Sequence, residues 1–363
     1  MKNRLHLLHI SPDFNYVCGV SKYIYLLLRE LKNYDEVKLF FITNGGDSLQ
    51  RLKDIGIYPY IMSFKKGLKN IFYVKKNLAE LKRFCIENQI NIIHTHHRYP
   101  ELLANNLKRE LNIKTITTVH SLVDGYRRLS FKSDKIIAVS TTVEKNLIEK
   151  FGVEKERIIQ IYNPLDFNEY KNIDEPADRS LLGIPDDAKV FLFVGRWTKI
   201  KGVDILVKAF RKITNNYPKV YLILITDISE TGKKRIQSIN QNFVFIKPQR
   251  DISYFYKICD AIILPSRVES FPFVMLEAGL YKKIFIGSNV GGVGEFIEDG
   301  RDGLLIKKED SNGLTNIIES VVKNLIDTQK LRTNLSNKVY SLLSLKEYSK
   351  SIINIYENLN EKN

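Results

Sequence analysis

The amino-acid sequence predicts an α/β protein with two doubly wound parallel sheets, a cleft between the two domains and a helical C-terminal tail. Short apolar runs alternate with segments of helical periodicity along most of the 363 residues. The runs are nearly continuous in apolar residues, which is typical of parallel strands covered by helices on both faces. The alternation restarts after residue 185, so we expect two domains, each with its own core.

The first half of the chain has six predicted strands and one clearly marked helix. Apolar residues from Val20 to Leu31 recur at intervals of three and four, which is the spacing of one buried helix face. The predicted strands are Leu5–Ile10, Val37–Thr43, Tyr58–Met62, Ile90–His94, Lys114–Val119 and Lys135–Val139.

The second half repeats this arrangement. Its predicted strands are Val190–Val194, Tyr221–Thr226, Phe243–Ile246, Ala261–Leu264 and Ile284–Gly287. The turn at Asn163–Asp166 and the polar segment Asn172–Ser180 predict a linker, and the tail after Leu314 is helical by pattern. We therefore expect an N-terminal domain over residues 1–170 and a C-terminal domain over 171–340. A terminal helix over 341–363 is expected to pack back toward the N-terminal domain.

Composition narrows the class of protein and of partner. The chain has 56 basic and 41 acidic residues, and residues 1–165 hold 27 of the basic and 16 of the acidic ones. This basic half fits an anionic partner, and it fits equally well a charge that only maintains solubility. Three widely spaced cysteines indicate neither a disulfide framework nor a zinc cluster. The run Leu5–Ile10 is too short for a signal peptide and no stretch could span a membrane, so we expect a cytoplasmic protein.

The segment from Pro265 to Ala278 carries the most chemical information. It follows a predicted buried strand, enters a helix near Phe273, and places Glu269 and Glu277 eight residues apart. Amides at the start of such a helix are suited to an anion such as a diphosphate. Glu277, on the helix, is suited to accept hydrogen bonds from a ribose, and Glu269 would face the sugar side of the same ligand. Two solvated glutamates flanking a turn are the simpler interpretation of this segment alone.

Two further loops follow predicted strands of the second half. In Val194–Gly202, two glycines bracket Arg196 and Lys201, cations placed to neutralise a departing nucleotide diphosphate. In Ser288–Glu295, three glycines permit a close approach of backbone to a ligand. Solvated basic residues and a plain turn are the simpler interpretations of these two loops.

In combination, these segments resemble the retaining glycosyltransferases of family 4, which have the GT-B fold of two Rossmann-like domains. The resemblance rests on the order Gly-Arg…Lys-Gly, Pro-Ser…Glu-x7-Glu, Gly-Gly…Glu and Asp299-Gly300…Gly303-Leu304-Leu305. It covers nearly the whole chain and is strongest over residues 190–306.

The resemblance implies a role for each matching residue. Arg196 and Lys201 correspond to the family's diphosphate-binding pair, Glu269 lies near the donor sugar, and Glu277 binds the ribose. The expected catalytic set is these two cations with Glu269 and His120. The turn that contacts sugar and phosphate comprises Ser270, Phe271, Pro272, Phe273 and Val274.

The first half matches the family at two positions and departs from it nearby. Gly19 belongs to the glycine loop near the donor phosphates, and His120 corresponds to the histidine beside the reacting sugar. Cys18 replaces a glycine of that loop, Asn163-Pro164 replaces the Asn-Gly turn of the interdomain segment, and Lys247-Pro248 replaces the glycine before the nucleotide-base loop.

We expect neither a metal nor another cofactor. The chain lacks the Asp-x-Asp pair with which metal-dependent sugar transferases hold a divalent ion, and the two cations supply positive charge in its place. It also lacks the Gly-x-Gly-x-x-Gly fingerprint of nicotinamide enzymes and the Walker phosphate loop. His94, His96 and His97 have no further metal ligands at a workable spacing, and we interpret them as a polar wall of the acceptor cleft.

Residues 65–83 concentrate the positive charge. Seven basic residues stand against one acidic residue, Glu80, and apolar residues from Ile71 to Cys85 follow a 3-4-3-4 spacing. The pattern predicts a helix with Lys69, Lys76 and Arg83 opposite its apolar face. That outer face is either a solvated surface or a patch that rests on an anionic membrane.

We therefore predict a retaining, metal-independent transferase that moves a hexose-type sugar from a nucleotide sugar, a UDP-sugar by preference. The expected acceptor is anionic or lipid-linked, as in the synthesis of a cell-surface polysaccharide at the inner face of the cell membrane. The Lys-, Asn- and Ile-rich composition is typical of an AT-rich bacterial genome. The alternatives are a nucleotide-sugar epimerase of the same fold and a basic nucleic-acid-binding protein, although we expect no nucleic acid because no helix-turn-helix signature is present.

Overall fold

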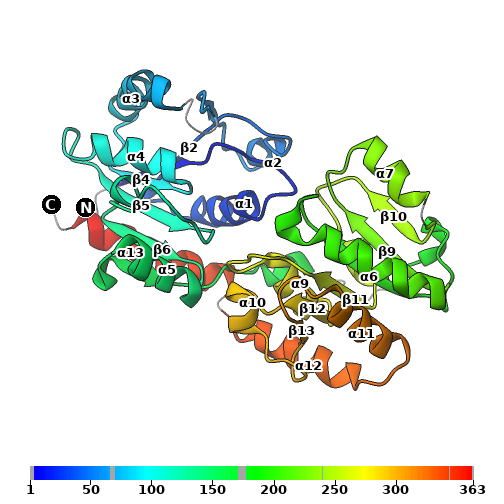
Figure 1. The fold of residues 1–363 in the computed structure, drawn as a ribbon. Coiled ribbons are helices and arrows are strands. Elements are labelled where there is room, and N and C mark those ends of the chain that lie inside the picture. Colours follow the sequence, from blue (N-terminus) through cyan, green and yellow to red (C-terminus); the bar gives the residue numbers. More distant parts are fainter. Residues whose placement is uncertain (1–3, 66–69, 171–176, 239, 343, 362–363) are drawn as a thin grey trace. The chain divides into compact units, whose positions relative to one another are not determined.

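The computed structural model describes residues 4–65, 70–170, 177–238, 240–342 and 344–361 (Figure 1). The chain divides into two compact units: unit 1 comprises Met1–Asp166 and Leu343–Asn363, and unit 2 comprises Phe167–Leu342. Each unit has one parallel sheet with helices around it. The predicted α/β class with two Rossmann-like domains is therefore confirmed.

Unit 1 contains a seven-stranded sheet in the order β3-β2-β1-β4-β5-β6-β7, with all neighbours parallel. The central strands are almost wholly buried, as their apolar runs predict. The strands are β1 (Leu5–Ile10), β2 (Val37–Thr43), β3 (Tyr60–Ile61), β4 (Ile92–Thr95), β5 (Lys114–Val119), β6 (Lys135–Ala138) and β7 (Ile158–Gln160). The α-helices are α1 (Gly19–Leu31), α2 (Gln50–Asp54), α3 (Asn70–Glu87), α4 (Arg98–Leu107), α5 (Thr141–Phe151) and α13 (Leu345–Asn360).

The C-terminal helix α13 is part of unit 1. It begins at a capping box, in which Ser344 and Glu347 each bond the other's backbone amide. Its buried face packs against α1, where the Tyr348 and Tyr23 hydroxyls are 2.6 Å apart. The last helix of the chain therefore completes the core of the first sheet.

Unit 2 contains a six-stranded parallel sheet in the order β10-β9-β8-β11-β12-β13. Its strands are β8 (Lys189–Val194), β9 (Val220–Ile225), β10 (Phe243–Ile246), β11 (Ala261–Leu264), β12 (Ile284–Ser288) and β13 (Leu304–Ile306). The α-helices are α6 (Val203–Asn216), α7 (Glu230–Gln237), α8 (Ser253–Ile258), α9 (Phe273–Leu280), α10 (Gly291–Phe296), α11 (Ser311–Val322) and α12 (Thr328–Tyr340).

In each sheet the strand order has one switch point, where successive strands begin to be added on the other side of the first strand. The switch point lies between β1 and β4 in unit 1 and between β8 and β11 in unit 2. Ligands of open α/β sheets bind outside the carboxyl ends of the strands at such a switch point. In unit 2 these ends lead into the two loops that carry Arg196, Lys201, Glu269 and the start of α9.

The structure corrects the predicted strands in four places. Strands β7 and β13 were not predicted, because each has only three residues and no periodic pattern can show in so short a run. Strand β3 is shorter than the predicted Tyr58–Met62, and β4 begins two residues later than predicted. Part of the predicted linker, residues 172–176, lies outside the described residues. None of the described helices combines the length and apolar character that a membrane crossing requires.

Candidate functional site

The loop between β11 and α9 holds Glu269 by two hydrogen bonds. Lys201 Nζ and Ser266 Oγ each donate to Glu269 Oε1 at 2.6 Å. The residue is only 7% exposed, and its Oε2 makes no hydrogen bond within the described part of the chain. One carboxylate oxygen is therefore anchored, and the other remains available to a ligand.

The loops after β8 and β11 are fastened to each other. Gly202 has a φ of +72°, and a Cβ there would lie 1.9 Å from the Pro265 carbonyl oxygen, so only glycine allows this contact. The Arg267 backbone amide donates to the Ile200 carbonyl at 2.7 Å, and its two Nη atoms donate to Asp204 at the start of α6, at 2.8 and 2.9 Å; its side chain also pairs with Glu309. These bonds raise the pKa of the Arg267 guanidinium. Arg267, which lies inside the predicted motif, thus holds the two loops together.

The two predicted diphosphate-binding cations differ in their surroundings. Lys201 is mostly buried against Glu269, with 21% of its side chain exposed. Arg196 is exposed, and within the described ranges its side chain makes no hydrogen bond or ion pair. The next residue, Trp197, donates its backbone amide to Asp227 Oδ1 at 2.7 Å and so fixes the loop. Arg196 can therefore turn toward an anion without breaking an existing contact.

Glu277 lies on α9, as predicted, and is 5% exposed. It accepts a hydrogen bond from the hydroxyl of Tyr256 on α8, whose ring stacks on Tyr281 with centroids 4.9 Å apart. Pro272, at the N-cap of this helix, provides no side-chain cap, and amides at the start of a helix are suited to an anion. Sequence reasoning missed Tyr256, because nothing in the pattern of α8 indicates a partner on another helix.

The glycine-rich segment after β12 is not a plain turn, because α10 begins at Gly291. A Cβ on Gly292 would lie 1.6 Å from the Ser270 carbonyl oxygen, and the Gly292 amide donates to the Glu269 carbonyl at 3.3 Å. The glycine is needed so that this backbone can support the Glu269 loop. Its close approach is to protein, whereas the sequence suggested a close approach to a ligand.

In unit 1, the loop after β1 leads into α1, where Gly19 is the first helical residue and is exposed. No side chain caps this helix at Cys18. The Ser11 hydroxyl donates to the Asp13 carbonyl at 3.1 Å, and the Ser21 hydroxyl accepts from the Asn15 amide at 3.0 Å. Ser11 and Ser21 therefore shape the loop, and Gly19 is the first residue of the helix that follows it.

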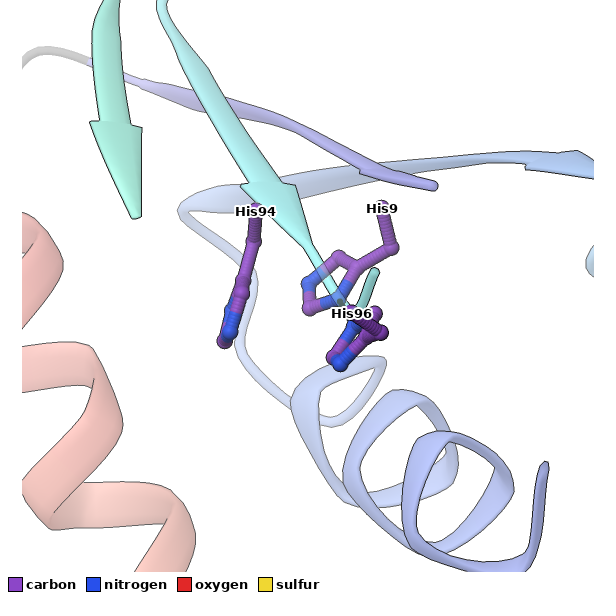
Figure 2. A group of neighbouring side chains, drawn as sticks. All are labelled: His9, His94 and His96. Carbon is purple, nitrogen blue, oxygen red and sulfur yellow. Dashed lines mark hydrogen bonds between the residues drawn. The ribbon is translucent and has the colours of Figure 1, made fainter. Parts of the chain in front are cut away.

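The interpretation of three histidines as a polar wall is wrong for two of them. His94 is fully buried and His96 is 3% exposed, and both lie against His9 from the neighbouring strand β1 (Figure 2). His97 is partly exposed, as is His120, whose Nε2 lies 3.2 Å from His96 Nδ1. Sequence reasoning missed His9, because the parallel pairing of β1 and β4 brings together residues 85 positions apart.

His9, His94 and His96 also have the composition of a three-histidine metal site, with donor atoms within 4.8 Å of one another. Each of their ring nitrogens, however, already has a hydrogen-bond partner among histidines, tyrosine and threonine. A metal ion would have to displace several of these bonds in a buried place. The hydrogen bonds account for the cluster as it stands.

Burial of the three clustered histidines, and of the neighbouring His97 and His120, should make the stability of unit 1 sensitive to acid. Desolvation lowers the pKa of His9 and His120 to about 3 and that of His97 to about 4, and it lowers the pKa of His94 and His96 well below 6.5. Below pH 6.5 the unfolded chain therefore binds more protons than the folded one. Stability is complete above pH 6.5 and falls toward pH 4, by about 1.4 kcal/mol per pH unit for each excluded proton.

Hydrogen exchange of β1 and β4 amides as a function of pH measures this effect, once rates are corrected for intrinsic exchange. His6 is a matched control, because it is the one histidine of the sequence that is not among these five. The His6→Gln variant should keep the wild-type slope, and His9→Asn should reduce it. An opening free energy that does not change between pH 6.5 and about 4 would contradict buried neutral imidazoles.

The basic segment forms α3 over most of its length, although Lys66 and Lys69 lie outside the described residues. Leu81 and Cys85 are buried, with Val74 and Leu78 packed beside them, which confirms the apolar face. The outward-facing described residues are Phe72, Lys75, Lys76, Ala79, Arg83, Ile86 and Glu87, and Glu87 Oε1 lies 4.0 Å from Arg83 Nε. Phe72 is 87% exposed, so the outer face combines cations with exposed apolar side chains.

Comparison with known proteins shows that both units match glycosyltransferase families. Residues 17–169 match the family model Glycosyltransferase Family 4, and residues 174–341 match Glycosyl transferases group 1. An uncharacterised glycosyltransferase of Methanocaldococcus jannaschii is 26% identical over 97% of both chains. The N-acetyl-alpha-D-glucosaminyl L-malate synthase of Bacillus anthracis is 26% identical over 77% of both. The crystal structure of Anabaena HepE in complex with UDP-glucose has a TM-score of 0.84 at 17% identity, covering 98% of this chain and 100% of HepE.

Proposed function

The chain belongs to the glycosyltransferases of the family 4 and group 1 type, and from this premise we propose that it is a retaining, metal-independent hexosyltransferase. Its donor is a nucleotide sugar, with a UDP-sugar favoured because the similar HepE structures contain UDP-glucose or UDP. Its acceptor is a lipid-linked or other membrane-associated glycan precursor.

The observation that carries this proposal is the pair of loops at the switch point of the second sheet. Two cations and two nearly buried glutamates lie on these loops and on the helix that follows. In this proposal Glu277 accepts hydrogen bonds from the ribose hydroxyls, and Glu269 Oε2 accepts one from the sugar. Arg196, Lys201 and the N-terminal end of α9 supply positive potential for the diphosphate.

In the proposed reaction the bond between the anomeric carbon and the diphosphate oxygen breaks, and the acceptor oxygen forms its bond on the same face. The departing phosphate takes the acceptor's proton. Negative charge therefore grows on the diphosphate, where Arg196 and Lys201 stabilise it more strongly in the transition state than in the bound donor. His120 orients the sugar, and Gly19 lies near the donor phosphates in this scheme; both roles follow the family resemblance.

The stereochemistry of the product tests this function. With UDP-glucose and an acceptor, NMR of the purified product should give the α-configuration of the donor at the anomeric carbon. An inverted product would contradict the retaining mechanism. Turnover of the donor to an isomeric nucleotide sugar, without any acceptor, would support the epimerase alternative.

We propose further that the outer face of α3 binds an anionic membrane. The cations Lys75, Lys76 and Arg83 lie there between the exposed side chains of Phe72 and Ile86, and the one exposed acidic residue among the described residues of this helix is Glu87, beside Arg83. Basic residues are attracted to anionic headgroups, and apolar ones insert at the boundary of the headgroups and acyl chains. Docking through this helix would place the enzyme where a lipid-linked acceptor lies.

Sedimentation with vesicles tests the membrane contact. Wild-type protein should bind vesicles that contain anionic lipid at low salt and dissociate near 1 M salt, where the screening length is about 3 Å. Changing Lys75, Lys76 and Arg83 together to Glu should abolish binding.

A control with the same change in charge comes from unit 2. The variant with Lys233, Lys234 and Arg235 on α7 changed to Glu should still bind vesicles through α3. If both triple variants lose binding equally, net charge alone would explain the attraction. Full activity of the α3 variant on a membrane-bound acceptor would also contradict a docking role.

A further inference from the structure

Eight side chains form one continuous hydrogen-bonded chain through the interior of unit 1. It runs from the C-terminal helix α13 to the histidine at the end of β5, and it includes all three residues of Figure 2. In order, the members are Tyr348, Tyr23, Thr118, His94, Tyr356, His9, His96 and His120.

The first part of the chain consists mainly of hydroxyl groups. The Tyr348 and Tyr23 hydroxyls are 2.6 Å apart, and Tyr23 OH is 3.4 Å from Thr118 Oγ1. Thr118 Oγ1 is in turn 2.7 Å from His94 Nε2. Tyr348 is fully buried, and within the described residues its hydroxyl has no partner other than Tyr23.

The second part consists mainly of imidazoles. His94 Nδ1 is 2.7 Å from Tyr356 OH, which is 3.4 Å from His9 Nε2. His9 Nδ1 lies 3.1 Å from His96 Nε2, and His96 Nδ1 lies 3.2 Å from His120 Nε2. His120 is partly exposed, and its Nδ1 has no partner in the part of the chain that the structure describes.

A count of hydrogens decides the direction of these bonds. A neutral imidazole and a hydroxyl each carry one hydrogen that can be donated, so eight groups supply eight hydrogens to seven contacts. Burial keeps the imidazoles neutral, as the pKa of about 3 for His9 and His120 reflects. One hydrogen is therefore left over. If each of the seven contacts contains one hydrogen, the eighth hydrogen must point outward, from either Tyr348 or His120.

The two ends are not equivalent. A hydrogen that pointed outward from Tyr348 would be buried without an acceptor, which costs the full desolvation of that group. At His120 the outward nitrogen can meet a ligand or water. If the donor direction reversed at some point between Tyr348 and His120, one of two faults would follow. Either two hydrogens would meet in one contact, or the Tyr348 hydrogen would have no acceptor.

We propose that the chain is polarised from Tyr348 to His120 and holds His120 as the Nδ1–H tautomer, a hydrogen-bond donor toward the substrate. His120 then recognises an oxygen lone pair, on a sugar hydroxyl or a phosphate, and cannot accept a proton at the nitrogen that faces outward. His9, His94, His96 and Tyr356 are positioning residues in this arrangement. The tautomer follows from unit 1 alone, whereas the role toward substrate rests on the proposed transferase function.

NMR of protein labelled with ¹⁵N-histidine tests the tautomer, because a protonated ring nitrogen and a bare one have well separated chemical shifts. At neutral pH, His120, His96, His9 and His94 should each carry the hydrogen on Nδ1. A hydrogen on Nε2 of His120, or a charged imidazolium there, would overturn the proposal. This measurement needs only the wild-type protein.

Two variants of α13 each remove one buried hydroxyl, but only one of them should interrupt the hydrogen bonds that fix the His120 tautomer. In Tyr356→Phe the chain is cut beside His9, whose Nε2 then lacks a partner in either direction, so His120 should become a mixture of tautomers. In Tyr348→Phe the hydrogen of Tyr23 still requires Thr118 as its acceptor, so His120 should stay in the Nδ1–H form. If both variants shift the tautomer equally, or neither does, the chain does not set it.

Activity gives an independent result. Loss of one correctly oriented donor should lower kcat/KM of Tyr356→Phe by about tenfold, while Tyr348→Phe stays within about twofold of wild type. The predicted tautomers in a protein without transferase activity would leave the inference intact and contradict only the proposed function. Equal losses of activity in both folded variants would contradict a positioning role.

Discussion

Replacing Lys201 or Arg196 with alanine should lower turnover about 10²-fold or more in each case. Both cations lie on the loop after β8, and in the proposed reaction the charge that they oppose develops on the diphosphate as the sugar departs. Lys201 Nζ also donates to Glu269 Oε1 at 2.6 Å, so its loss should disorder the carboxylate that we propose faces the sugar. Steady-state kinetics with a UDP-sugar should show the effect mainly in kcat, because an interaction gained in the transition state does not change ground-state binding.

Lys199 provides the matched control for this prediction. It lies on the same loop and is exposed, and no side-chain bond of this residue is present in the described structure. The Lys199→Ala variant should therefore keep turnover close to wild type. If it fails as badly as the other two, the loop's general charge would matter more than the named cations.

The same kinetics test the absence of a metal from the mechanism. A chelator such as EDTA should leave the wild-type enzyme active, since positive charge comes from the protein. Activity that is lost in EDTA and restored by magnesium would contradict the metal-independent mechanism.

Replacing Glu277 with alanine should weaken nucleotide binding about 10²-fold and nearly abolish transfer. In the proposed site Glu277 accepts from both ribose hydroxyls, and hydrogen bonds to a charged carboxylate are the stronger kind. Titration calorimetry with UDP measures this loss directly. Unchanged affinity would exclude Glu277 from the ribose site.

The hydrogen bond from Tyr256 to Glu277 requires its own control, because removal of Glu277 also leaves a buried hydroxyl without its acceptor. The Tyr256→Phe variant removes that hydroxyl and keeps the carboxylate. It should bind UDP with an affinity within about tenfold of wild type, since a net hydrogen bond contributes about 1 kcal/mol. A loss as large as that of Glu277→Ala would indicate that the glutamate's role is structural.

Most of the fold could be predicted from the sequence, because long apolar runs and helical periodicity are strong signals. The run in β8 and the apolar face of α1 each span several residues and were placed within one residue of their observed bounds. Strands β7 and β13 could not be found this way, because a three-residue edge strand is defined by its pairing partner.

The donor loops could be located from the sequence because they directly follow strands. What the sequence could not provide was the set of contacts between residues far apart in the chain. Glu277 meets Tyr256 from another helix, and Gly292 supports the Ser270 loop from another strand end. His9 and Tyr356 join His94 in the interior, although they are separated from it by 85 and 262 positions. Composition and periodicity do not predict which distant residues come into contact.

The measurement that tests the central claim most directly is titration calorimetry of the wild-type protein with a panel of nucleotide sugars and their free diphosphates. The proposed donor site predicts that at least one nucleotide sugar, with a UDP-sugar favoured, and its free diphosphate bind at one site per chain. That binding should persist in EDTA. If no nucleotide sugar or diphosphate binds, the loops after β8 and β11 are not a donor site.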